Sequence, residues 1–420
     1  MSESILKTKV LSIREQSEVI YRIIKKRINT LLPVFMEDTG YDCWLILCYE
    51  DNPDPVLFTL VPLNTWTPIL QILAFFNRKT KIIGYNISGM ETYDLYDRPY
   101  RGQDETTQWE KLKQLISEYA PKRIGINIGH TIWAASGLSY ALYTKLCEVL
   151  PTMYVKRLVS AEPLVTLWAS TLIEEEMDLY PHVVQVGVML IEECFSKIVP
   201  HITTVDDLTW HYYQLCADLG IQPGFKPTFR ILRRPERIKQ YGEDDHVIRP
   251  GDLIHCDVGI KYLRLHTDHQ RWAYMRETTT GFSILEELSN LYKAANQLQD
   301  IFLEELRLGS TGNEILSSVL SRARKEGLPS PKVYSHSLGY FLHEPGPLIG
   351  LPWEQNQCPG RGDIVLGDNT AVSMELSVAE SIKYFKNKEL VLSLEEDVLI
   401  RGGRAQIMVS RQRAPYIVEG

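Results

Sequence analysis

Residues 251 to 275 read G-D-L-I-H-C-D-V-G-I-K-Y-L-R-L-H-T-D-H-Q-R-W-A-Y-M, and this stretch decides the fold. It contains two short apolar runs, 253 to 258 and 272 to 275, which are typical of buried strands. Asp257 lies inside the first run, and Asp268 follows it eleven residues later, just before the second run. The sequence therefore places two carboxylates on or beside strands of a buried sheet.

These two aspartates need a partner. A carboxylate in a buried strand is costly unless it is paired, hydrogen-bonded or bound to a cation. Arg264, Arg271 and backbone N–H groups are possible structural partners close by in the sequence. Taken alone, the two aspartates favour such pairing over a functional site.

Two later segments repeat the pattern of a carboxylate within an apolar run. A-V-S-M-E-L-S-V (371 to 378) carries Glu375. L-S-L-E-E-D-V-L-I (392 to 400) carries Glu395 and Glu396. The chain thus has four strand-like segments that each bring an acidic side chain, which is more than chance pairing with arginines explains.

A histidine segment lies between the two pairs of strands. Y-S-H-S-L-G-Y-F-L-H-E-P-G-P (334 to 347) carries His336 and His343, seven residues apart, and a Pro-Gly turn follows. Oxygen ligands and an imidazole suit two divalent cations that share carboxylates and lower the pKa of a bound water. A structural zinc site favours a closed set of Cys and His, and no cysteine stands at a suitable spacing here.

Composition narrows the class of protein. The 420 residues are 44% hydrophobic and 23% charged, which is ordinary for a globular protein, and the length favours two domains. A net charge of −8 argues against a nucleic-acid binder. The most basic run, 230 to 239, is interpreted as a solvated loop.

The remaining sequence signals indicate a cytoplasmic protein. Seven scattered cysteines form no C-x-x-C pair, and they are expected to be free thiols. The N-terminus has no apolar stretch with a cleavage site, and no segment approaches 18 uninterrupted apolar residues. We therefore expect a soluble, reduced, cytoplasmic protein without a membrane partner.

The pattern of predicted elements changes along the chain. Strands and helices alternate over the first 150 residues or so, which favours an α/β domain at 1–158, with a strand at 42–49 paired to one at 56–61. Residues 159–420 show helix, helix and strands twice, which predicts one pseudo-repeat domain. The four predicted helices are 171–198, 203–220, 283–302 and 311–327, and the β-rich stretches are 227–277 and 364–409.

The order Asp, Asp, His, Glu, Glu resembles the creatinase/methionine aminopeptidase superfamily. The matching stretches are G-D-L-I-H-C-D-V-G, T-D-H-Q-R, H-S-L-G-Y-F-L-H-E-P, S-M-E and E-E-D-V-L-I. Within that superfamily the two-domain layout is similar to Xaa-Pro aminopeptidases and prolidases. The resemblance implies a mixed α/β (α+β) protein, with an N-terminal creatinase-like α/β domain and a C-terminal pita-bread domain.

The resemblance also implies roles for particular residues. The implied metal ligands are Asp257, Asp268, His336, Glu375 and Glu396. Glu396 is preferred over Glu395 because the family motif runs acid, Asp and then an apolar strand. His343 would stabilise the tetrahedral intermediate, and Glu375 would also carry a proton to the leaving nitrogen.

Together these features predict a dinuclear metal-dependent hydrolase that cleaves an amide bond near a free N-terminus through a metal-bridging hydroxide. The two divalent ions are expected to be Mn²⁺, with Zn²⁺, Co²⁺ or Fe²⁺ as alternatives. The substrate would be a peptide or a small amide, and analogy with two-domain relatives predicts a homodimer. Three other hypotheses stay open: a metal-independent creatinase-like C–N hydrolase, an inactive protein that binds peptides or partner proteins, and a metal protein that carries out redox or other chemistry on a small compound derived from an amino acid.

The resemblance is incomplete around the ligands. At five positions the family commonly has His, His, Gly, Pro and Arg, where this chain has Gln240, Lys332, Ser337, Leu376 and Leu394. His246 is a displaced candidate for the substrate-binding histidine missing at Gln240. The ligand set is thus complete while the residues that recognise proline are altered, which leaves the substrate open.

Overall fold

The computed structural model describes residues 9–66, 69–79, 81–100, 104–277, 284–343 and 345–419. It divides into two compact units, Ile13–Glu175, and Met1–Ser12 with Glu176–Gly420. The boundary predicted after residue 158 falls too early. β5 (Leu158–Ser160) pairs with β4 (Ile124–Ile126) in a parallel ladder, so the chain beyond residue 158 still belongs to the first unit.

The unit Ile13–Glu175 is built on a five-stranded sheet in the order β3-β2-β1-β4-β5. Its strands and helices alternate as the sequence predicts. The elements are α2 (Ile13–Thr30), α3 (Leu32–Asp38), β1 (Cys43–Tyr49), η1 (Leu57–Thr59), β2 (Leu70–Asn77), β3 (Ile82–Asn86), α4 (Glu105–Tyr119), β4, η2 (Trp133–Ala135), α5 (Tyr140–Val149), α6 (Thr152–Val155), β5 and α7 (Glu162–Ser170).

The strand predicted at 56–61 is wrong. This segment forms the short 3₁₀ helix η1, and β1 pairs instead with β2 in an antiparallel ladder. The cause is the buried Asp54, whose carboxylate accepts hydrogen bonds from the Val56 N–H at 2.9 Å and the Asn127 side chain at 2.8 Å. These bonds turn the chain away from an extended path.

The second unit contains an eight-stranded sheet whose main path is β12-β13-β14-β11-β8-β7, with β15 on β14 and β16 on β11. Two helices precede each half of the sheet, so the predicted repeat of helix, helix and strands is confirmed. The elements are α8 (Glu174–Ser196), α9 (Val205–Leu219), β6 (Gln222–Pro223), β7 (Thr228–Leu232), α10 (Pro235–Tyr241), β8 (Leu253–Val258), β9 (Ile260–Tyr262), β10 (Leu265–His266), β11 (His269–Met275), α11 (Ile284–Glu305), α12 (Gly312–Lys325), β12 (Lys332–Leu338), η3 (Arg361–Asp363), β13 (Thr370–Ile382), η4 (Lys383–Phe385), β14 (Lys388–Arg401), β15 (Arg404–Ile407) and β16 (Tyr416–Val418).

Capping residues set the helix ends close to where the sequence predicts them. α9 begins with a capping box between Thr204 and Asp207, and it ends at Gly220, which has a left-handed conformation at φ 66°. α12 begins with a second capping box between Thr311 and Glu314. Of the helices that the structure describes, none has the length and apolar character that crossing a membrane requires.

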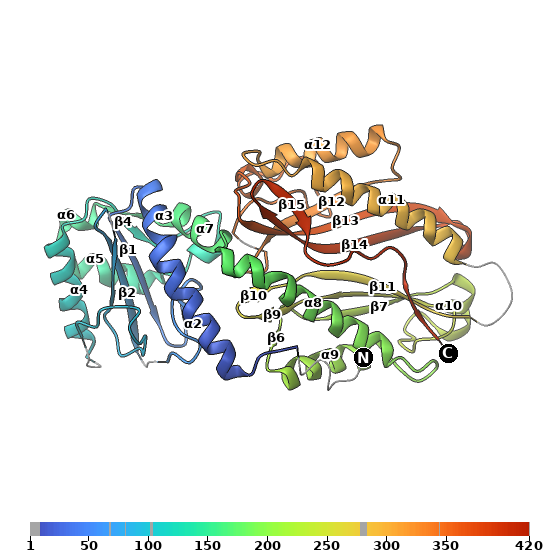
Figure 1. The fold of residues 1–420 in the computed structure, drawn as a ribbon, viewed down its shortest axis with the longest axis horizontal. Helices are drawn as coiled ribbons and strands as arrows, with labels where there is room; N and C mark the ends of the chain where they lie inside the picture. Colours follow the sequence, from blue (N-terminus) through green and yellow to red (C-terminus); the bar gives the residue numbers. More distant parts are fainter. Residues whose placement is uncertain are drawn as a thin grey trace. The chain divides into compact units, whose positions relative to one another are not determined.

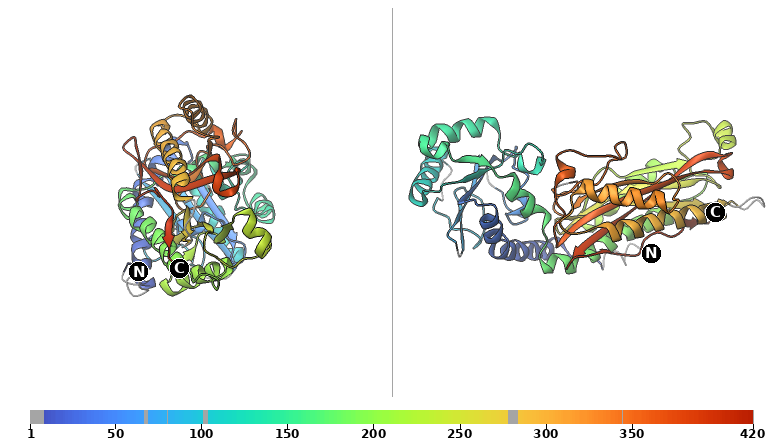
Figure 2. Two further views of the ribbon diagram at one scale, coloured as in Figure 1. Left: turned by 90° about the vertical axis from the view of Figure 1, so that its right-hand side faces the viewer. Right: turned by 90° about the horizontal axis from the view of Figure 1, so that it is seen from above.

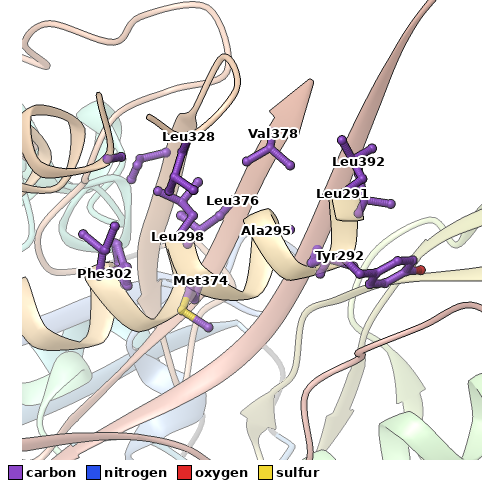
Figure 3. Packing of buried hydrophobic residues seen from close by; sticks show 14 of the residues in the cluster. Leu291, Tyr292, Ala295, Leu298, Phe302, Leu328, Met374, Leu376, Val378 and Leu392 are labelled. Carbon is purple, nitrogen blue, oxygen red and sulfur yellow. The ribbon is translucent and has the colours of Figure 1, made fainter. Parts of the chain in front are cut away.

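Helices α11 and α12 cover the same face of strands β12, β13 and β14 (Figures 1 and 2). Leu298 and Phe302 of α11 are buried against β13, where Met374, Leu376 and Val378 point toward the helix (Figure 3). These three β13 positions are even-numbered because successive strand side chains alternate between faces. The odd-numbered side chains therefore lie on the opposite face, which the helices leave uncovered.

We expect Phe302→Ala to destabilise this unit strongly. Removing a fully buried aromatic ring from the helix–sheet core costs about 3–5 kcal/mol, because the packing cannot close the cavity. The matched control is Ile202→Ala, since Ile202 is 71% exposed. Urea unfolding should separate the two variants, and equal midpoints would contradict the assigned core.

Candidate metal centre

One cross-strand row of side chains forms the floor of the site. Residues that lie directly opposite each other on neighbouring antiparallel strands point to the same face of the sheet. Asp257 on β8 pairs with Gln270 on β11, Gln270 pairs with Glu395 on β14, and Glu395 pairs with Glu375 on β13. The row ends at Tyr334 on β12, which pairs with Glu375. Five strands thus bring three carboxylates into one line.

A second group of residues lies beside this row. Asp268 precedes β11, and His336 on β12 pairs with Ser373 on β13, which in turn pairs with Asp397 on β14. Asp257, Asp268 and Glu395 each offer one oxygen, and these atoms all lie within 4.8 Å of one another. Asp268, His336 and His343 form a second such group, with ligand atoms also within 4.8 Å. Asp268 is common to both groups, so it links the carboxylates to the histidines.

The structure brings together all but one of the predicted metal ligands, and the exception is Glu396. The β14 residues Leu390, Leu392 and Leu394 belong to the core under the helices, as do Val398 and Ile400. Glu396 has the same even parity and therefore points into that core. Its neighbour Glu395 has the odd parity that faces Asp257 and Asp268.

Glu396 has a structural partner of its own. Its carboxylate receives two hydrogen bonds from the guanidinium of Arg271, one at 2.7 Å, and the Gln412 backbone N–H donates a third at 2.9 Å. Burial raises the pKa of Glu396, and Arg271 opposes that rise. Glu396, which the resemblance implies as a metal ligand, is therefore the partner of a buried arginine, and Glu395 takes its place in the cluster.

Burial shifts the pKa of every carboxyl group in the cluster upward, and repulsion from neighbouring carboxylates adds to the shift at Asp268, Glu375 and Glu395. Desolvation raises the pKa of Asp257 to about 6 and that of Glu375 to about 7. Desolvation also raises the pKa values of Asp268 and Glu395 well above their usual range, and charge repulsion from the neighbouring carboxylates adds to this. Without a cation these groups hold protons that isolated carboxyl groups would lose.

Burial shifts the pKa values of the imidazole groups downward. Burial lowers the pKa of His336 to about 4, so the ring is neutral at pH 7 and a nitrogen lone pair is free for a cation. Its Nε2 lies 3.5 Å from an oxygen of Asp268, which is too long for a good hydrogen bond. Among the described residues, neither this Nε2 nor the other Asp268 oxygen, Oδ1, has a hydrogen-bond partner, although both are buried.

This donor set fits divalent cations. Buried polar atoms without partners are rare in folded proteins, and each needs an explanation such as an ion. Carboxylate oxygens with one imidazole match the preferences of Mn²⁺, Fe²⁺, Co²⁺ and Zn²⁺. Asp257, Asp268, Glu375, Glu395 and His336 are therefore the residues that would hold the ions.

Gln270 is a site residue that the sequence analysis missed. Its amide nitrogen donates to Glu395 at 3.0 Å, and its amide also hydrogen-bonds Glu375. Its carbonyl oxygen lies 3.0 Å from Nε2 of His255, whose ring packs on Trp272. Gln270 thus fixes the two glutamates relative to each other. Strand alternation could have indicated this role, since Gln270 lies two residues after Asp268.

His343 lies beside the cluster, as predicted, with its ring 4.6 Å from that of His336. Its side chain is exposed, and its carbonyl accepts a hydrogen bond from the Arg361 guanidinium. Although the residue is more than a third exposed, partial desolvation of its ring lowers the pKa of His343 to about 4, with smaller contributions from His336 and Arg361. Arg361 belongs to the short 3₁₀ helix η3 (Arg361–Asp363), which places its positively charged guanidinium beside His343. Glu344 of the same motif lies outside the described residues.

His246, the candidate for substrate binding, lies away from the cluster. It is exposed in the loop before β8, and its carbonyl accepts from the Val205 N–H at the start of α9. Asp257 is near the other end of β8, five positions into a strand that rises about 3.4 Å per residue. The structure therefore gives His246 no place at the site.

Solved structures with this arrangement of strands and helices are numerous. An X-Pro aminopeptidase from Thermotoga maritima superposes with a TM-score of 0.65 at 16% identity, covering 90% of this chain and 98% of that one. An Xaa-Pro dipeptidase from Bacillus anthracis gives 0.61 at 14%, covering 96% and 100%. A prolidase from Pyrococcus horikoshii gives 0.58 at 15%, covering 95% and 99%. These likenesses confirm the predicted two-domain pita-bread fold.

A comparison with family models identifies the family. Residues 182–402, more than half of the chain, match the model of metallopeptidase family M24. The chain belongs to this family, and the predicted resemblance is confirmed. A search of curated protein sequences found no match.

Neighbouring glutamates on β14 provide a direct test of the ligand assignment. We expect Glu395→Gln to lose about one of two bound metal equivalents, because it removes a bridging charge. Glu396→Gln should keep both equivalents but lower stability by about 3–5 kcal/mol, since it leaves Arg271 buried without its charge partner. Elemental analysis and thermal unfolding of both variants separate these effects. Metal loss in Glu396→Gln with Glu395→Gln unaffected would reverse the assignment.

Metal binding should compete with protons. A carboxyl group whose pKa is raised by folding stabilises the metal-free protein below its unfolded pKa, and this contribution is lost as the pH rises through the folded value. For Asp257 and Glu375 that loss extends from about pH 4 to pH 6 and 7. A cation binds the ionised form, so added Mn²⁺ should raise the melting temperature more at about pH 8 than at about pH 5.5. Equal increases at both pH values would contradict this account.

Proposed function

We propose that this protein is a dinuclear metal-dependent hydrolase that cleaves an amide bond near a free N-terminus. The observation that carries this proposal is the convergence of Asp257, Asp268, Glu395, Glu375 and His336 on one face of the sheet. Membership of metallopeptidase family M24 supports the same reaction class. Mn²⁺ is the proposed metal, and a homodimer in the cytoplasm is the proposed form of the protein.

The proposed reaction adds water across an amide, with hydroxyl to the acyl carbon and a proton to the leaving nitrogen. Two bound cations would lower the pKa of a water between them and so supply a nucleophile at neutral pH. Glu375 is suited to move the proton, because its carboxyl group lies directly opposite Glu395 within the cluster. His343 is uncharged at neutral pH and can donate an N–H to the substrate carbonyl oxygen as charge develops there.

Proline specificity has little support from the residues around the ligands. Lys332 and Ser337 stand where proline-specific relatives commonly have histidine and glycine. Replacing Glu396 by Glu395 as the last ligand also moves the usual arginine position from Leu394 to Ser393, which again is not basic. We therefore propose a hydrolase for small peptides or amides that does not require proline.

The test is a panel of dipeptides, with and without proline, assayed with Mn²⁺ and with chelator. We expect metal-dependent hydrolysis, and we expect His343→Ala to lower kcat by about 10²–10³ while metal content is unchanged. Lys325→Met, an exposed change on α12, is the control. Full activity in chelator would favour a creatinase-like enzyme. Bound metal with saturable peptide binding but no turnover would favour a protein that only binds peptides.

A further inference from the structure

A small pocket lies next to Glu375 in the second unit. It has a volume of about 150 Å³. Its polar lining comes from Lys332, Tyr334, Glu375, Ser377 and Ser393. A volume of this size accommodates a group about as large as a benzene ring. The pocket is therefore suited to one small part of a substrate rather than to a long chain.

Strand register explains why the polar residues converge there. Lys332 on β12 lies directly opposite Ser377 on β13, and Ser377 lies opposite Ser393 on β14. These three residues form a row parallel to the row of Tyr334, Glu375 and Glu395. The two rows are two residues apart along each strand, which is about 7 Å.

The chemistry of the pocket favours an anion. Both serines are half-buried and offer hydroxyl donors, and Lys332 is exposed and brings a full positive charge. The one described polar contact of the Lys332 ammonium is the Pro352 carbonyl oxygen, at a long 3.4 Å. The ammonium group thus keeps donors available for a ligand, and hydrogen bonds between ammonium and carboxylate are among the strong ones.

The position of the pocket identifies which part of the substrate it would take. Under the proposed function, Glu375 delivers the proton to the leaving nitrogen, so the leaving group departs on the side of Glu375. The pocket opens against that same side chain, beyond the row of carboxylates that contains Glu375 and Glu395. A substituent on the leaving nitrogen is therefore directed toward Lys332 and the two serines.

We infer that Lys332, Ser377 and Ser393 bind the carboxylate of a small leaving amino acid, so that the enzyme prefers dipeptides with a free C-terminus. This inference rests on the proposed function, because it uses the role of Glu375. Lys332 acts as a specificity-determining residue. A longer peptide or a C-terminal amide has no negative charge at this position, so Lys332 does not increase its affinity.

The decisive comparison is between L-alanyl-L-alanine and L-alanyl-L-alaninamide on the Mn²⁺-loaded enzyme. The wild type should favour the free acid by about tenfold or more in kcat/KM, mainly through KM, which is the range expected for a hydrogen bond to a charged group. Lys332→Met should reduce the preference to about onefold with metal content unchanged, and Lys332→Arg should restore most of it. Lys325→Met should behave as the wild type.

Two outcomes overturn the inference while leaving the proposed function intact. These are equal hydrolysis of acid and amide by the wild type, and an unchanged preference in Lys332→Met. Failure of the proposed function is recognised separately, as bound metal without hydrolysis of any peptide. In that case titration calorimetry measures the affinity of the pocket for L-alanine and for L-alaninamide without requiring hydrolysis. Tighter binding of L-alanine that is lost in Lys332→Met supports the inference, and equal binding of the two ligands overturns it.

Discussion

The repulsion among buried carboxylates is the constraint on which the second unit depends. Asp268 and Glu395 are both almost fully buried, and the charge of Asp268 raises the pKa of Glu375 and of Glu395. A structure that places such groups together is unfavourable unless protons or cations neutralise them. At neutral pH protons can do so only in part, because Asp257 and Glu375 titrate near 6 and 7. The arrangement therefore makes sense chemically as a cation-binding site that hydrogen bonds from Gln270 keep in register.

Side-chain alternation along β14 separates the acidic cluster from the hydrophobic core. Glu395 and Glu396 are adjacent in the sequence, yet they face opposite sides of the sheet. One joins the acidic cluster, and the other neutralises Arg271 beneath the helices. Successive side chains of a strand point to opposite faces, so a shift of β14 by one residue would turn Glu395 into the core and Glu396 toward the acidic cluster. Such a shift would break the pair that Glu396 forms with Arg271. The Arg271–Glu396 pair is thus well placed to hold the register that the site requires.

Much of the fold could be predicted because short sequence patterns, such as helix caps and the spacing of apolar residues, determine its helices and strands. The capping residues Thr204 and Thr311 and the periodic apolar residues of α11 set helices near the expected bounds. The prediction of Glu396 as a ligand followed the order of residues in the family motif and ignored the alternation of side chains along the strand. The run of leucines at 390, 392 and 394 already placed position 396 on the core face.

Other parts of the site could not be predicted from local pattern. Arg361 reaches His343 through a loop contact 18 residues away in sequence, and no periodicity encodes such a contact. The pocket at Lys332 depends on the pairing of three strands, so it becomes visible only once the register is known. The strand wrongly expected at 56–61 has a similar cause, since buried hydrogen bonds of Asp54 overrode an apolar pattern.

We propose that Asp257, Asp268, Glu375 and Glu395, together with His336, hold two divalent cations. Anomalous diffraction from crystals of the wild-type protein grown with Mn²⁺ tests it most directly. The proposal predicts two manganese peaks held by these five side chains. A single peak, or ions bound by Glu396 instead of Glu395, would contradict it.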